Sequence, residues 1–145
     1  MIISVISAFI STITFSVVFH VQKKHLLICG AVGALGWLVY LLCLDKNLSS
    51  VLSTFIASLL VTQLSYILAR KRRTPVTVFL IAGIIPLVPG VGLYRTMAAI
   101  LDSNYSLAVN YAALTFQVSA VIAGAIVIIA LLPLLWRKPQ RRRKI

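Results

Sequence analysis

Five apolar segments, each about as long as a membrane-crossing helix, dominate this sequence of 145 residues. A helix needs about 20 apolar residues to cross the roughly 30 Å hydrocarbon core of a bilayer. Only 11% of the residues are charged, whereas soluble domains carry about 25%. We therefore predict an all-α integral membrane protein with five transmembrane helices. The predicted spans are about 2–20, 26–44, 49–69, 76–101 and 111–136.

The connections between these segments are short and leave no room for a soluble domain. We predict a single five-span membrane domain over residues 1–136, followed by a basic cytosolic tail over 137–145.

The basic residues predict the orientation of the chain. The formal net charge is +12, and all bases except Lys46 and Arg95 fall in three clusters at the ends of apolar segments. The clusters are Lys23-Lys24, 70–73 and the bases of 137–144. Clusters in such places mark the cytoplasmic side and contact anionic lipid, so we expect a lipid bilayer and no nucleic acid as partner.

The fourth segment admits two readings, because its prolines could make it a re-entrant hairpin. If it crosses, all three basic clusters lie on one side and both acids, Asp45 and Asp102, lie on the other. If it only dips in and returns, the basic clusters are split between the two sides, against the positive-inside rule. We therefore predict five crossings, with the N-terminus outside and the C-terminus in the cytosol.

The fourth span contains the element IPLVPGVGLYR, residues 85–95, near its middle. Pro86 and Pro89 should each disfavour helix at the residue before them, and Gly90 and Gly92 permit unusual backbone angles. We predict that PLVPG breaks this helix near the bilayer midplane, although an ordinary packing kink is an alternative.

A broken span leaves backbone groups without partners. In transporters, half-helix N-termini at the midplane hold anionic groups, and here a second half-helix should start near Val91. Arg95, about one turn further, can grip a carboxylate with two hydrogen bonds. The alternative is that Arg95 snorkels outward to Asp102 or to lipid headgroups.

Hydroxyl residues recur every four positions in the third span, at Ser50, Thr54, Ser58 and Thr62. Small residues at this spacing let helices pack closely in lipid, and the row could also line a polar path. Gln63 and Gln117 favour a buried or wet face for their helices.

Nothing in the sequence resembles a catalytic constellation. The two carboxylates lie in separate loops, and His20 and His25 flank Lys23-Lys24, where we interpret them as interfacial polar residues. With no nucleophile beside a base and no metal-ligand spacing, we expect no enzyme, no metal and no cofactor.

The segment STFIASLLV at 53–61, followed by a basic loop and IPLVPGVGLYRTM at 85–97, resembles the small membrane component of the threonine/serine exporter (ThrE-type) family. The matching elements are T-F-x-A-S and P-x-x-P-G-x-x-x-Y. They fall at Thr54, Phe55, Ala57 and Ser58, and at Pro86, Pro89, Gly90 and Tyr94.

The resemblance implies a secondary exporter of small amino acids or dicarboxylates in the bacterial cytoplasmic (inner) membrane. It also implies a larger membrane subunit as partner, because split members pair a small chain with a longer one. The sequence has no internal repeat, and transporters commonly use two repeats around one site, so a partner chain or a homo-oligomer is expected.

The predicted function is one half of a heteromeric exporter of threonine, serine or C4 dicarboxylates. The substrate-binding residues predicted for it are Thr54, Ser58, Pro86, Pro89, Gly90, Gly92, Tyr94 and Arg95. Two alternatives stay open: a non-transporting scaffold or assembly subunit, and a small homo-oligomeric channel.

Overall fold

The computed structural model describes residues 1–135, and every regular element among them is helical. The predicted tail at 137–145 lies outside the described residues, as does the C-terminal basic cluster. The elements are α1 (Ile2–Val18), α2 (Lys23–Asp45), α3 (Ser50–Arg72), α4 (Thr77–Ile84), the 3-10 helix η1 (Ile85–Leu87), α5 (Gly90–Leu101) and α6 (Tyr105–Leu135).

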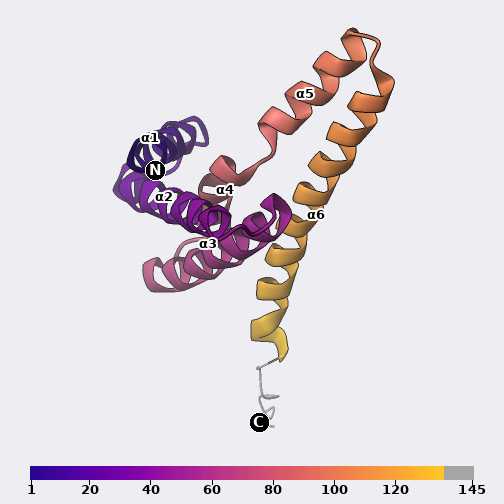
Figure 1. Cartoon of the computed structure of the whole chain (residues 1–145). Coiled ribbons are helices and arrows are strands. Elements are labelled where there is room, and N and C mark those ends of the chain that lie inside the picture. The colour runs from indigo at the N-terminus through magenta and orange to yellow at the C-terminus, as the bar shows by residue number, and fades with distance from the viewer. Residues whose placement is uncertain (136–145) are drawn as a thin grey trace, which may run out of the picture.

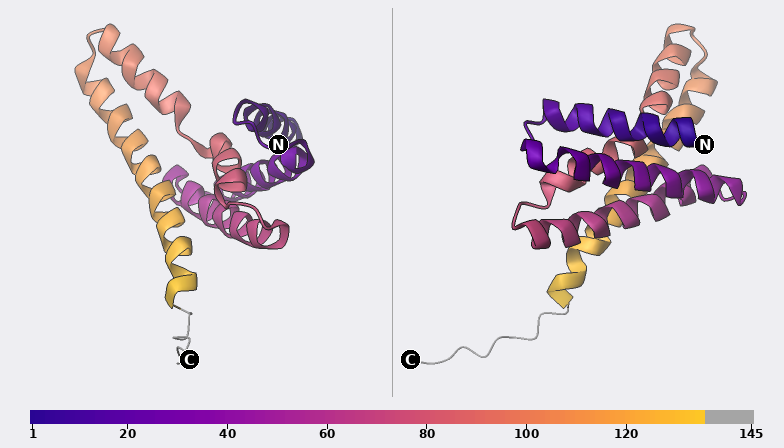
Figure 2. Two further views of the ribbon diagram at one scale, coloured as in Figure 1. Left: turned by 180° about the vertical axis from the view of Figure 1, so that it is seen from behind. Right: turned by 90° about the vertical axis from the view of Figure 1, so that its left-hand side faces the viewer.

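The helices form a bundle from which a hairpin projects (Figures 1 and 2). Helices α1 to α4 pack on one another, with α2 contacting α1, α3 and α4. The hairpin consists of α5 and α6. Helix α6 joins it to the bundle through α3, whereas α5 contacts α6 and no other helix of the described chain.

The main core lies where α2, α3, η1 and α6 meet. Its buried members include Val32, Val61, Leu87 and Val118. Glycines bring the helices close together, because a Cβ at Gly83 would lie 2.7 Å from Val32 Cγ1 and 3.0 Å from Val61 Cγ1. The small residues of α2 and α4 therefore serve helix packing, as expected for helices that associate in lipid.

Three helices, α2, α3 and α6, are long and apolar enough to cross a membrane. The helical stretches 77–87 and 90–101 pass the same test as a pair bent by 50°, which gives up to four crossings. Helix α1 is apolar but has 17 residues, so it spans only about 26 Å. The chain is a multi-pass membrane protein, and the fifth crossing stays a prediction.

Gln63 and Gln117 are both exposed on the surface of the described chain. A wet face, or a face buried against another chain, therefore stays a prediction for both. The neighbouring Thr62 and Val118 take the inward positions instead, because one residue is a rotation of about 100° on a helix.

Candidate functional site

The helix path is interrupted at Val88 and Pro89. Val88 has an extended backbone with φ −62° and ψ 132°, and Pro89 has φ −77° and ψ 57°. The Gly90 N–H donates to the Val88 carbonyl oxygen at 2.8 Å, which closes an inverse γ-turn around Pro89. The extended conformation of Val88 is the one that a following proline favours.

The sequence analysis assigned two wrong causes to this geometry. No glycine among the described residues has a positive φ, so Gly90 and Gly92 do not supply unusual backbone angles. Ile85 before Pro86 keeps helical angles of φ −48° and ψ −46°, so Pro86 does not make its preceding residue extended. Proline is tolerated in a first helical turn, and at Pro86 the α-helix α4 passes into the 3-10 helix η1. Only the residue before Pro89 is extended.

Helix α5 starts with free backbone amides. Its first regular bond runs from the Leu93 N–H to the Pro89 carbonyl oxygen, at 3.1 Å. Within the described chain, the amides of Val91 and Gly92 have no backbone acceptor. These N–H groups carry the positive partial charge of the helix N-terminus.

The two glycines at this helix start have different surroundings. A Cβ at Gly92 would collide with the Thr115 hydroxyl and lie 3.4 Å from Thr115 Cβ, whereas a Cβ at Gly90 would meet nothing within 4 Å. Gly92 therefore allows α5 to pack closely on α6, and Gly90 borders open space.

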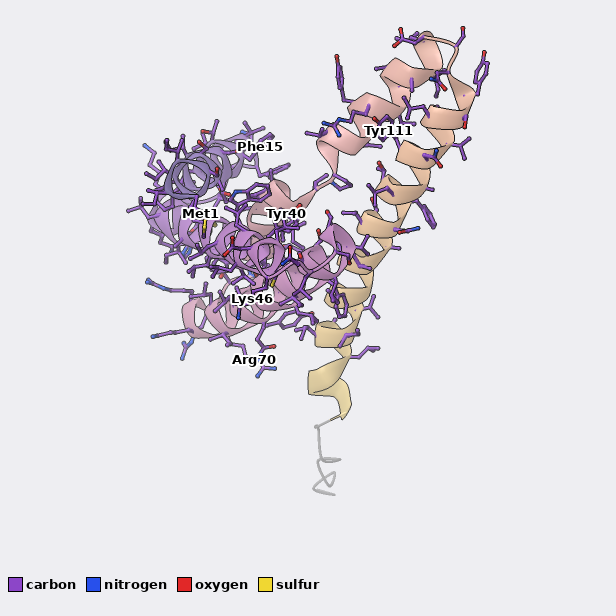
Figure 3. The ribbon with its side chains drawn as sticks, viewed as in Figure 1. Met1, Phe15, Tyr40, Lys46, Arg70 and Tyr111 are labelled. Carbon is purple, nitrogen blue, oxygen red and sulfur yellow. The ribbon has the colours of Figure 1, made fainter. Side chains whose placement is uncertain are left out.

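Tyr94 and Arg95 project from the α5–α6 hairpin. Tyr94 is 74% exposed. The Arg95 guanidinium lies over the ring of Tyr111 on α6, with Cζ 5.9 Å from the ring centroid, which is a cation–π distance. Figure 3 labels Tyr111 in the α5–α6 hairpin. The Tyr111 ring thus orients Arg95, the only basic residue of α5.

The hydroxyl row of α3 is buried in the bundle from Thr54 onward, whereas Ser50 is half-buried. Thr54 Oγ1 donates to the Ser50 carbonyl at 2.8 Å, and Thr62 Oγ1 donates to the Ser58 carbonyl at 2.7 Å. Ser58 differs, because its Oγ is buried and has no partner. Buried polar atoms almost always have a hydrogen-bond partner, so Ser58 is the member of this row that can accept a new one.

The structure divides the predicted site residues into two groups. Thr54, Ser58 and Pro86 belong to α3 and η1, which contact each other. Gly90, Gly92, Tyr94 and Arg95 belong to α5, which contacts only α6 in the described chain. Pro89 connects the groups. Their common role in binding stays a prediction.

Two residues of α6 contact this region, Tyr111 and Thr115. The sequence did not predict Tyr111 here, and it indicated Thr115 only as a small residue for helix packing. A signal for them existed in the short connection between α5 and α6, Asp102–Asn104. Antiparallel helices around such a turn pair positions at equal distances from it. Counting outward from Ser103, Arg95 comes opposite Tyr111, and Gly92 comes opposite Thr115 within one position.

In residues 1–135, no three His, Cys, Asp or Glu side chains gather closely enough to hold a metal ion.

The fold and its apolar helices define a multi-pass helical membrane protein. The family model described as "Threonine/Serine exporter, ThrE" matches residues 4–132, and the chain belongs to that family. This family consists of transporters and not of enzymes.

One curated relative, an uncharacterized protein of Haemophilus influenzae (strain ATCC 51907 / DSM 11121 / KW20 / Rd), is 32% identical over 98 residues. The matched region covers 68% of this chain and 33% of the relative. The matching part of the chain therefore spans about a third of that protein's length. No solved structure matches the chain.

Proposed function

We propose that this chain is one half of a heteromeric secondary exporter of threonine, serine or C4 dicarboxylates across the bacterial inner membrane. Membership of the threonine/serine exporter family over residues 4–132 carries the proposal. The turn at Pro89 supports it, since interrupted spans are a recurring device of secondary transporters.

The proposed substrate site is centred on the start of α5. The substrate carboxylate accepts hydrogen bonds from the free amides of Val91 and Gly92, with Arg95 as a second donor group. Tyr94, Thr54 and Ser58 supply neutral hydrogen bonds. Because α5 does not contact α3 in this conformation, the proposal requires the α5–α6 hairpin to approach α3 during the transport cycle.

Two exposed amides support a partner subunit in the membrane. Gln63 on α3 and Gln117 on α6 lie on the outer surface of apolar helices, and an unpaired amide in lipid costs several kcal/mol, about 4–8 by water-to-cyclohexane transfer. The Haemophilus relative carries about two thirds of its length outside the matched region. We infer that a larger membrane subunit covers these amides, and a second copy of this chain is the alternative.

The proposed orientation places the N-terminus outside and the C-terminus in the cytosol. Lys23-Lys24 at the start of α2 and the bases at the end of α3 lie at the same end of the bundle (Figure 2), which favours a cytoplasmic location for that end.

The proton gradient is the simplest energy source for the proposed export. Since neither carboxylate of this chain lies within an apolar span, the proton-carrying group would belong to the partner.

Efflux from preloaded cells tests the function. Cells expressing this chain with the product of its neighbouring gene should export labelled threonine, serine or succinate, and cells expressing this chain alone should not. A non-transporting scaffold predicts no efflux in any combination with both chains inserted. A homo-oligomeric channel predicts unselective leak from this chain alone.

The lysine substitution of Arg95 tests its proposed contact with the substrate. Arg95→Lys keeps the charge and the contact with Tyr111 but loses the planar two-donor fork, so efflux should fall about tenfold, the loss of one charge-assisted hydrogen bond. The measurement is the initial efflux rate at equal membrane abundance. An unchanged rate would mean that Arg95 extends only toward the membrane–water interface and does not contact the substrate.

A further inference from the structure

A cavity of about 360 Å³ lies between the α1–α2 turn and the start of α4. Both turns lie at the same end of the bundle, as the right-hand view of Figure 2 shows. One side of the cavity wall consists of residues 19–22 and His25. The other side consists of Thr74, Pro75, Thr77, Val78, Ile81 and Ala82. The proposed transport site does not use any of these residues.

The cavity wall contains two buried polar groups that lack partners. His25 is 2% exposed, and within residues 1–135 neither its Nδ1 nor its Nε2 has a hydrogen-bond partner. Thr74 Oγ1 is buried and unpaired in the same way. The His25 ring is held edge-on against Phe79, with centroids 5.4 Å apart. Buried polar groups almost always have a hydrogen-bond partner, so two such groups in one wall are suited to bind a polar ligand.

His25 is buried within the chain, with Phe79 of α4 packed against its ring, and its predicted location at the membrane interface stays a prediction. His20, in contrast, is exposed, with a positive φ of 55°.

The surroundings of the cavity favour an anion. Helices α2 and α4 both begin at its rim, and neither has a side-chain cap within the described residues, so the positive ends of two helix dipoles lie there. Lys23 and Lys24 are exposed beside it. A ligand with oxygen acceptors and negative charge would match the donors of His25 and Thr74 and the positive ends of the two helices.

The apolar part of the wall distinguishes a lipid from a soluble anion. Phe19 and Ile81 line the cavity and are 52% and 50% exposed on the outer surface. Phe19 directly follows α1, and Ile81 lies in the second turn of α4. Pockets between membrane helices with basic residues nearby bind lipid headgroups. We propose that this cavity binds the phosphate headgroup of an anionic phospholipid, with the acyl chains running past Phe19 and Ile81 into the bilayer.

Lipid binding to the purified full-length chain in detergent tests the proposal. Phosphatidylglycerol should bind at one saturable site, measured by native mass spectrometry, and phosphatidylcholine should not. Thr74→Val keeps the side-chain shape and removes the hydroxyl, and His25→Phe removes both ring nitrogens. Each should weaken binding about tenfold, as expected for one lost hydrogen bond to a charged group.

Thr96→Val is the matched control, because Thr96 lies on α5 away from the cavity and donates to the Gly92 carbonyl. It should bind phosphatidylglycerol as the unaltered chain does. Equal binding of both lipids, or binding unaffected by Thr74→Val, would overturn the proposal. Competition by inorganic phosphate as strong as by phosphatidylglycerol would overturn the lipid assignment in favour of a soluble anion. None of these binding measurements depends on transport activity.

Discussion

Replacing Pro89 with alanine should reduce substrate efflux at least about tenfold while the chain still inserts in the membrane. Alanine restores a backbone donor and frees Val88 from its extended conformation. The two helical stretches, now bent by 50°, can then join into one continuous helix. In that helix the amides of Val91 and Gly92 bond to carbonyls one turn earlier, and they are lost as donors for a carboxylate.

The control for this substitution is Val88→Ala, one residue earlier. It removes an exposed side chain but leaves Pro89 and its turn in place, so efflux should stay close to that of the unaltered chain. Efflux that survives Pro89→Ala with normal insertion would mean that the interruption is only a packing kink. That result would favour the scaffold alternative over the proposed site.

Replacing Gly33 with leucine should lower the free energy of unfolding by about 3 kcal/mol, the upper range for overpacked interiors. A Cβ at Gly33 would collide with the Thr12 side chain, approaching within 2.9 Å of its Cγ2. Thr12 is fully buried, and its Oγ1 is fixed by a 2.7 Å hydrogen bond to the Ala8 carbonyl. The clash can be relieved only by separating α1 from α2. Thermal unfolding in detergent measures the loss.

Gly124→Leu is the matched control, since Gly124 also lies inside a helix and a Cβ there meets nothing within 4 Å. Its melting temperature should stay near that of the unaltered chain. If both leucine variants lost the same stability, the cost would come from the helices themselves, and the proposed contact between α1 and α2 would be refuted.

The helical class and the positions of the turns could be predicted from the sequence, because short polar stretches separate its apolar segments. Helix α3 begins where Ser49 accepts a hydrogen bond from the Leu52 N–H, at 3.3 Å, and ends at the positive φ of Arg73. Helix α6 begins six residues before the predicted span. Asn104 caps it through the Leu107 N–H, and a helix can extend beyond the membrane that it crosses.

Tertiary placement was harder to predict. The burial of His25 depends on the α3–α4 connection, which lies about fifty positions away in the chain. The exposure of Gln63 and Gln117 depends on which helix covers α3 and α6, and a pattern of apolar residues does not encode that choice. The separation of α5 from α3 has the same origin. Thr54 and Arg95 both carry hydrogen-bond donors. Whether they lie close together depends on the direction of the turn at Pro89, which local helix propensity does not determine.

The most direct measurement is efflux of labelled threonine from liposomes that contain this chain and the product of its neighbouring gene, both purified. The account predicts saturable efflux with both chains, no efflux with either chain alone, and loss of efflux when Pro89→Ala is present. Saturable efflux from this chain alone would contradict the two-chain arrangement. Efflux by the partner at the same rate without this chain would contradict the assignment of this chain to the transport path.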